Sequence, residues 1–125
     1  DDDELKSWYC SCDLFFFPSR FETFGNAVLE AMVFGKPIFA SRVIGVRDLV
    51  KDDENGLLFM ADDFKGMYDS FTYLIQNKKL LGRMGEQSRI AASNYSIEAM
   101  AKETEVYYVS ILTRKRQEPW ARKSK

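Results

Sequence analysis

Two short apolar runs on either side of a helical segment constrain the fold of this chain more than any other feature of its sequence. Residues 14–17 form the first run, which Pro18 ends, and residues 37–40 form the second. Runs of this length that are apolar at consecutive positions are typical of strands buried on both faces. A strand, a helix and a second buried strand in succession predict a parallel pair joined by a right-handed crossover. We therefore expect an α/β architecture.

The helical segment between the two runs carries a single charged residue. Residues 27–34 are apolar at every position except Glu30, with Asn26 as the expected helix cap and Gly35 as the expected stop. A helix of this composition is expected to be buried on most sides, so its carboxylate must find donors. A ribose diol could supply two hydroxyl donors. A salt bridge is an equal alternative, and the candidate partners are Arg20, Lys36, Arg42 and Arg47.

The rest of the chain predicts one more strand and several helices. A short amphipathic helix over residues 4–12 would place Leu5, Trp8 and Tyr9 on one face. A turn over residues 52–56, with positive backbone angles favoured at its Asn-Gly pair, precedes a strand at 57–59. One helical turn near residues 45–50 and three later helices, the last capped by Ser96, complete the pattern. About three strands are fewer than an open parallel sheet usually has, so we expect a partial Rossmann-like sheet from a longer protein.

Composition excludes several classes of function. The two cysteines, Cys10 and Cys12, stand without any histidine, which is too small a ligand set for a zinc site. Free thiols indicate a reducing compartment, and we expect a cytoplasmic protein. No apolar run approaches the length of a membrane span. Residues 114–125 carry +5 of a net charge of −1, which leaves −6 on residues 1–113. Such a basic tail could contact an anionic membrane surface peripherally, or nucleic acid, which we do not expect as a partner; a solvated terminus is the alternative.

The loop after the first strand is the expected binding region. Ligands of open α/β sheets bind beyond the carboxyl ends of the strands, and residues 18–26 occupy that position here. Gly25 allows a ligand to approach the backbone closely. The helix that follows offers amides and the positive end of its dipole to an anion such as a phosphate.

The sequence across this loop and helix resembles glycosyltransferase family 4, whose members are retaining enzymes of the GT-B fold. The resemblance rests first on residues 17–32, which read FPSRFETFGNAVLEAM. It continues in order through residues 35–38, Gly45, residues 48–50, 55–59, 83–85 and 96–101. It covers about residues 8–112. The resemblance implies that residues 1–113 are the later part of a C-terminal nucleotide-sugar-binding domain, followed by the basic tail.

The resemblance also implies roles for individual residues. Glu30 would bind the ribose hydroxyls of a sugar nucleotide. Glu22 would be the catalytic residue, which lies by the donor sugar, holds its hydroxyls and helps at the reacting face. The amides of Phe24, Gly25 and Asn26 would meet the donor sugar, and those of Ala27, Val28 and Leu29 would meet the diphosphate. These amides and the helix dipole would stabilise the charge on the departing nucleoside diphosphate. No metal or other cofactor is expected. The implied activity is transfer of a hexose to a glycan or lipid acceptor.

Three departures from the family pattern limit that inference. Val33 or Phe34 stands where the family usually has a small residue, and Ile44 stands where it has the first glycine of a Gly-Gly pair. The family's upstream Gly-rich turn and basic pair, and its N-terminal acceptor domain, have no counterpart in this sequence. Arg20 and Arg42 are not assigned to the role of that pair. Donor binding without catalysis by the isolated chain is therefore an alternative function. Another enzyme of the same fold, a sugar-nucleotide epimerase or a glycogen-type synthase, is a weaker one.

Overall fold

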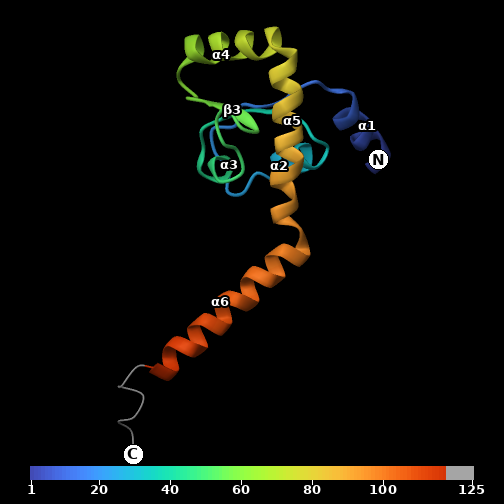
Figure 1. The fold of residues 1–125 in the computed structure, drawn as a ribbon. Helices are drawn as coiled ribbons and strands as arrows, with labels where there is room; N and C mark the ends of the chain where they lie inside the picture. The colour runs from blue at the N-terminus through green and yellow to red at the C-terminus, as the bar shows by residue number, and fades with distance from the viewer. Residues whose placement is uncertain (118–125) are drawn as a thin grey trace, which may run out of the picture. The chain divides into compact units, whose positions relative to one another are not determined.

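A computed structural model describes residues 1–117 of the chain (Figure 1). The strands and helices alternate through the first part of the chain, and helices alone follow the third strand. In chain order the elements are α1 (Asp2–Ser11), β1 (Phe15–Phe17), α2 (Asn26–Val33), β2 (Ile38–Ser41), α3 (Ile44–Arg47), β3 (Gly56–Phe59), α4 (Phe64–Gln76), α5 (Lys78–Ala92), the 3-10 turn η1 (Ser93–Tyr95) and α6 (Ile97–Gln117).

The three strands form one parallel sheet in the order β1-β2-β3. Phe16 lies opposite Phe39 of β2, and Phe39 lies opposite Leu57 of β3. All four residues of β2 are buried, as its apolar run predicts. Helices surround the sheet: α2 contacts β1 and β2, α5 contacts β2 and β3, and α4 contacts β3. The predicted α/β class and the parallel pairing are confirmed.

β1 is less buried than its sequence predicts. The side chain of Phe16 remains 46% exposed. Its ring still contacts the apolar cluster on the sheet, since the ring centroids of Phe16 and Phe39 are 5.6 Å apart. The difference has a tertiary reason, because α4 and α5 pack mainly on β2 and β3, whereas β1 packs mainly on β2 and α2. A run of apolar residues predicts cover on both faces of the strand, and the face of Phe16 is only partly covered.

The core joins β2 and β3 to the helices that follow them. Phe39, Phe59, Leu74 and Met84 form a buried cluster. Partly buried residues pack against it from β3, the two helices and the residue before β1: Leu14, Leu57, Met67, Leu80 and Leu81. Leu74 and Met84 come from α4 and α5, so the predicted helical spacing places its apolar residues on the sheet.

α2 ends as the sequence predicts. Gly35 has φ +68°, the left-handed conformation that glycine adopts without strain. Its amide donates to the carbonyl of Met32 at 2.9 Å, and the amide of Lys36 donates to the carbonyl of Ala31 at 3.0 Å. This pair of bonds is the Schellman motif, which satisfies the last carbonyls of the helix.

The turn before β3 differs from the prediction. Positive φ falls on Asp53 (63°), not on the Asn-Gly pair. Asn55 is buried, and its side chain accepts from the amide of Lys51 at 2.7 Å and donates to the carbonyl of Leu49 at 2.9 Å. The hydroxyl of Ser88 on α5 donates to the carbonyl of Asn55 at 3.0 Å. These bonds to more distant residues set the shape of the turn, and dipeptide preference alone does not.

The described chain divides into two units, the first of which is Asp1–Ser93. The second begins at Asn94 and contains α6. Ser96 caps α6 as predicted, with its hydroxyl oxygen accepting from the amide of Ala99 at 3.1 Å. The predicted boundary at 113/114 falls inside α6, and residues 118–125 of the predicted basic tail lie outside the described residues. No helix within residues 1–117 is both long enough and apolar enough to span a membrane.

The close approach of α5 to the end of α2 makes a stability prediction. A Cβ added at Gly85 would collide with the carbonyl oxygen of Gly35. We expect Gly85→Ala to lower the free energy of unfolding by about 1–3 kcal/mol, the usual cost of overpacking, in urea titrations. Gly82→Ala on the same helix is the matched control, because a Cβ there meets nothing within 4 Å. The control should be neutral or stabilising by up to about 1 kcal/mol, since alanine favours a helix. Equal effects of the two substitutions would contradict the packing described here.

Candidate functional site

The loop between β1 and α2 lies where the sequence places it, at the carboxyl end of a parallel strand. Gly25 has φ +85° and is the N-cap of α2. The predicted cap, Asn26, is instead the first helical residue, and no side chain caps this helix. The positive φ favours glycine at this position, and a Cβ there would also lie only 3.2 Å from Cδ1 of Leu49, whose side chain would have to shift slightly.

The loop is tied to the segment that follows β2. The amide of Gly45 donates to the carbonyl of Glu22 at 3.1 Å. A Cβ at Gly45 would collide with the backbone of Thr23 and Phe24, so the two segments touch backbone to backbone. Of the family's two glycines at positions 44 and 45, this chain keeps the second, which is the one that the contact requires. Ile44, which replaces the first, is exposed.

Glu22 is not a freely solvated acid, because its carboxylate is folded back on its own loop. Oε1 accepts from the amide of Thr23 at 2.8 Å and from the amide of Phe24 at 3.2 Å. Hydrogen bonds from the amides of Phe24, Gly25 and Thr23 lower the pKa of Glu22 below its ordinary value of 4.5. These amides form a small anion-binding turn at the start of α2, and the carboxylate of Glu22 occupies it.

The amides assigned to a donor therefore fall into three groups. Those of Phe24 and Gly25 face the carboxylate of Glu22. Those of Asn26, Ala27 and Val28 belong to the first turn of α2, where amides lack an acceptor within the helix. That of Leu29 already donates to the carbonyl of Gly25 at 3.0 Å. The first-turn amides are thus the ones best placed to receive a phosphate, and the roles of all six residues remain predictions.

Glu30 lies on the exposed side of α2, which corrects the expectation of a helix buried on most sides. Val28, Ala31 and Met32 form the buried face, and Val33 near Glu30 is 57% exposed. The apolar composition of α2 predicts that other elements pack on all its sides, but the side that carries Glu30 and Val33 is exposed to solvent. Glu30 is therefore accessible to a ligand.

Glu30 has a partner that the sequence did not suggest. The hydroxyl of Tyr9 on α1 donates to Oε2 of Glu30 at 3.0 Å. Tyr9 was predicted on the apolar face of α1, and it is the residue of that face that is buried, whereas Leu5 and Trp8 are exposed. Burial and the bond to Glu30 together raise the pKa of Tyr9 to about 12. A tyrosine on an amphipathic helix is an ordinary core residue in sequence, so no local signal identified this contact.

The predicted salt-bridge partners of Glu30 are not paired with it in the described part of the chain. Lys36 donates to the carbonyls of Cys10 and Cys12 at 3.0 and 2.9 Å. Arg42 pairs with Asp52. Arg42 thus supports the turn before β3 and does not face the loop of Glu22. Both cysteines are free thiols.

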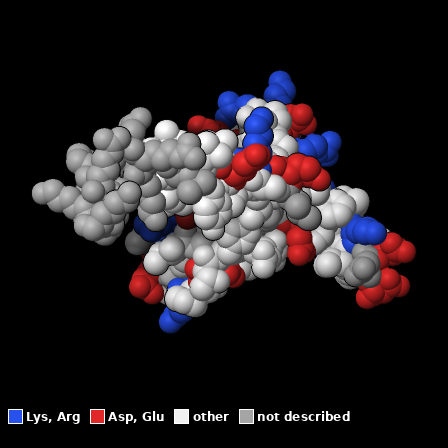
Figure 2. Space-filling model, turned by 90° about the horizontal axis from the view of Figure 1, so that it is seen from below, with Lys and Arg blue, Asp and Glu red and all other residues white. Residues whose placement is uncertain are grey.

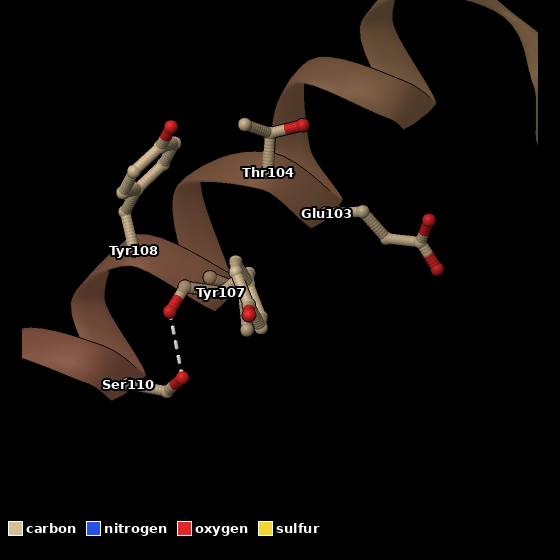
Figure 3. A pocket seen from close by; sticks show the side chains of 6 residues that line it. Glu103, Thr104, Tyr107, Tyr108 and Ser110 are labelled. Carbon is tan, nitrogen blue, oxygen red and sulfur yellow. Dashed lines mark hydrogen bonds between the residues drawn. The ribbon is translucent and has the colours of Figure 1, made fainter. Parts of the chain in front are cut away.

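Three surface hollows are lined by residues other than these acids. One of about 610 Å³ runs along α6 and is lined from a single helix, by Glu103, Thr104, Val106, Tyr107, Tyr108 and Ser110 (Figure 3). Its side chains stand apart, and the dashed bond in Figure 3 joins Ser110 to the backbone carbonyl of Tyr107 at 2.6 Å. Another in the second unit, of about 350 Å³, is lined by Asn94, Ala99, Lys102, Glu103 and Val106. The third, of about 240 Å³ in the first unit, is lined by Asp13, Leu14, Ile75, Lys78 and Leu81. None of the three brings together groups that could carry out a reaction.

Charge and metal ligands give no second candidate site. Acidic and basic side chains both occur on the face shown in Figure 2, so that face is not a surface of one sign. Within residues 1–117, no three His, Cys, Asp or Glu side chains are grouped closely enough to hold a metal ion. The loop after β1 and the exposed side of α2 are therefore the candidate site.

Comparison with known proteins decides the family. The model of the family "Glycosyl transferases group 1" matches residues 1–91, which include every strand and the whole candidate site. The chain belongs to the glycosyltransferase group 1 family.

Curated glycosyltransferases are similar to most of this chain. The lipopolysaccharide core biosynthesis mannosyltransferase LpsB of Rhizobium meliloti is 33% identical over 111 residues, which cover 86% of this chain and 32% of that protein. The D-inositol 3-phosphate glycosyltransferase of Corynebacterium urealyticum is 32% identical over 117 residues, which cover 94% of this chain and 28% of that protein. The chain spans less than a third of the length of these relatives.

Solved structures show the same fold. The sucrose-phosphate synthase of Thermosynechococcus elongatus matches 91% of this chain with a TM-score of 0.77 and 25% identity, over 29% of that chain. The C-terminal domain of the group 1 protein LpcC from Francisella tularensis matches 78% of this chain with a TM-score of 0.70 and 28% identity, over 50% of that domain. The predicted α/β fold, with a parallel sheet like that of a GT-B C-terminal domain, agrees with both.

The lowered pKa of Glu22 predicts a pH dependence of stability. A folded pKa below the unfolded one means that the carboxylate stabilises the fold above its ordinary value of 4.5 and loses this contribution as the pH falls through the folded pKa. We expect melting temperatures between about pH 5 and pH 3 to fall more steeply for the unchanged chain than for Glu22→Gln, whose side chain does not titrate. Glu86→Gln, an exposed position on α5, is the control and should follow the unchanged chain. A Glu22→Gln curve parallel to that of the unchanged chain would mean that the bonds to the loop amides do not stabilise the fold.

Proposed function

We propose that this chain binds the nucleotide-sugar donor of a retaining hexosyltransferase. The observation that carries the proposal is the accessible carboxylate of Glu30, one helical turn beyond the first-turn amides of α2, at the carboxyl end of β1. On this one helix, the amides can bind a phosphate and the nearby carboxylate can bind a diol. Membership of the group 1 family supports reading these groups as a donor site.

The proposed contacts divide between side chain and backbone. Glu30 accepts hydrogen bonds from the ribose hydroxyls of the nucleotide. The amides of Asn26, Ala27 and Val28, with the positive end of the α2 dipole, hold the diphosphate and stabilise the charge that develops on it as the leaving group. Because backbone groups supply this stabilisation, we expect no metal requirement.

Glu22 is proposed to contact the donor sugar at the reacting face. Its carboxylate now bonds the amides of Thr23 and Phe24. An ionised carboxylate has about four lone-pair sites, so Glu22 can keep these bonds and still accept from a sugar hydroxyl. Its lowered pKa keeps it ionised at neutral pH, which suits an acceptor and not a general acid.

The whole enzyme is proposed to retain the anomeric configuration and to transfer a hexose to a glycan or lipid acceptor. The resemblance to family 4 and the mannosyltransferase named among the relatives support this assignment. A cytoplasmic location, with the basic tail as a peripheral membrane contact, belongs to the same proposal. The candidate nucleotides are uridine diphosphate and guanosine diphosphate. One structure of similar fold contains UDP, and one relative is named as GDP-mannose-dependent.

The second candidate function is donor binding without catalysis by this chain alone. The specific observation is its coverage, since it corresponds to 50% of an isolated C-terminal domain and less than a third of curated relatives. Positioning of two substrates supplies a large part of the rate in group transfer, and the described residues form one side of a donor site.

The role of Glu30 is tested by calorimetry with UDP and GDP. Removing an acceptor for two hydroxyl donors should lower the affinity of the better ligand about tenfold or more in Glu30→Ala, since bonds to charged groups are worth about 1.5–3 kcal/mol. Glu86→Ala removes an exposed carboxylate from α5 and should bind like the unchanged chain. Equal affinities for Glu30→Ala and the unchanged chain would remove Glu30 from the site.

The second candidate is tested by donor hydrolysis. We expect the 125-residue chain to release no detectable nucleoside diphosphate from UDP- or GDP-hexoses in a coupled assay, because the opposite wall of the site is not formed by its described residues. Turnover that disappears in Glu22→Gln would instead show that this chain is catalytic on its own.

A further inference from the structure

Tyr9 links α1 to α2. It does so through Glu30, the acid proposed to bind the ribose of the nucleotide. Its hydroxyl lies 3.0 Å from Oε2 of Glu30 and 3.5 Å from the carbonyl oxygen of Ala27. The shorter of the two contacts is a normal hydrogen bond and the longer is at the limit of one. A tyrosine hydroxyl has one proton to donate, so Glu30 receives it.

The ring of Tyr9 is held more firmly than its position on a terminal helix suggests. Tyr9 is 7% exposed. It stacks on Phe34 with ring centroids 5.2 Å apart and an angle of 10°, and it contacts Phe15 of β1 at 5.8 Å. Lys36, just after α2, donates to the carbonyls of Cys10 and Cys12 at the end of α1. The hydroxyl of Tyr9 is thereby fixed with respect to α2.

We propose that Tyr9 is a positioning residue, which fixes the carboxylate of Glu30 so that its remaining lone pairs accept from the ribose hydroxyls. This inference rests on the proposed donor-binding function. Glu30 is exposed, and a free glutamate at an exposed helical position samples several rotamers. One bond from a rigid donor removes much of that freedom before a ligand arrives, and pre-organisation of this kind raises affinity.

The bond leaves the binding capacity of Glu30 largely intact. Tyr9 uses one lone pair of Oε2, which leaves the other lone pair of Oε2 and both of Oε1 for hydroxyl donors. The tyrosine also remains a donor at every physiological pH, because its pKa is raised to about 12. Two ribose hydroxyls therefore find acceptors without displacing Tyr9.

A purely structural role for Tyr9, docking α1 on α2, makes a different prediction. Tyr9→Phe removes the hydroxyl and keeps the ring that stacks on Phe34 and Phe15. If the hydroxyl serves docking alone, any loss of nucleotide affinity should be the same for nucleotides with and without ribose hydroxyls. If it positions Glu30, the loss should depend on those hydroxyls.

The experiment measures calorimetric affinities of the full chain for UDP, GDP and their 2′,3′-dideoxy forms. We expect Tyr9→Phe to weaken the better diphosphate about three- to tenfold, the value of one hydrogen bond. Its affinity for the matching dideoxy nucleotide should equal that of the unchanged chain. In the Glu30→Ala background Tyr9→Phe should have no further effect, because the group that it positions is gone. Tyr68→Phe, an exposed tyrosine on α4, is the control and should change nothing.

Each other outcome overturns the inference in a recognisable way. Equal losses for the ribose and dideoxy nucleotides in Tyr9→Phe would assign the hydroxyl to docking of α1. A loss in Glu30→Ala without a loss in Tyr9→Phe would remove Tyr9 and leave the proposed function standing. Absence of UDP and GDP binding by the unchanged chain would remove the proposed function and this inference together. Melting temperatures of all variants show whether a weakened variant is folded.

Discussion

The parallel pairing of β2 with both β1 and β3 is the constraint on which the rest of this structure depends. Parallel strands bring their carboxyl ends to one edge of the sheet, so the loops after β1 and β2 are neighbours although a whole helix separates them in sequence. The bond from the amide of Gly45 to the carbonyl of Glu22 and the tight backbone contact at Gly45 follow from that adjacency. The loop of Glu22 therefore takes its shape from β2 as much as from its own residues.

Features with local causes were predicted well. The stop at Gly35 and the cap at Ser96 each depend on residues within a few positions, and the structure contains both. Features with distant causes were missed. The exposure of Phe16 depends on which helices cover β1, and the turn that contains Asp53 and Asn55 is bonded by Ser88 of α5. No spacing rule reports such contacts.

In the candidate site, too, the residues were predicted from the sequence and their tertiary contacts were not. The order of motifs predicted glycosyltransferase family 4, and the comparisons support it at the level of the glycosyltransferase group 1 family. The motifs also placed Glu22 on a loop and Glu30 on the helix after it, as the structure has them. The partners of these acids were not predictable, because Glu22 turns to the amides beside it and Glu30 meets Tyr9 from a separate helix. Residue type and spacing identified the acids, and tertiary packing determined which groups each acid contacts.

The carboxylate of Glu22 gives the loop a built-in anion. Because it already satisfies the amides of Thr23 and Phe24, the loop is ordered before any ligand is present. A ligand anion that binds the same two amides would have to displace the carboxylate of Glu22, and the loss of those bonds would reduce its net binding free energy. An anion at the amides of residues 26–28 would require no such displacement, because the carboxylate of Glu22 bonds earlier amides. In the proposed site, Glu22 would therefore favour ligands whose negative charge lies beside α2 and whose neutral part lies beside the loop.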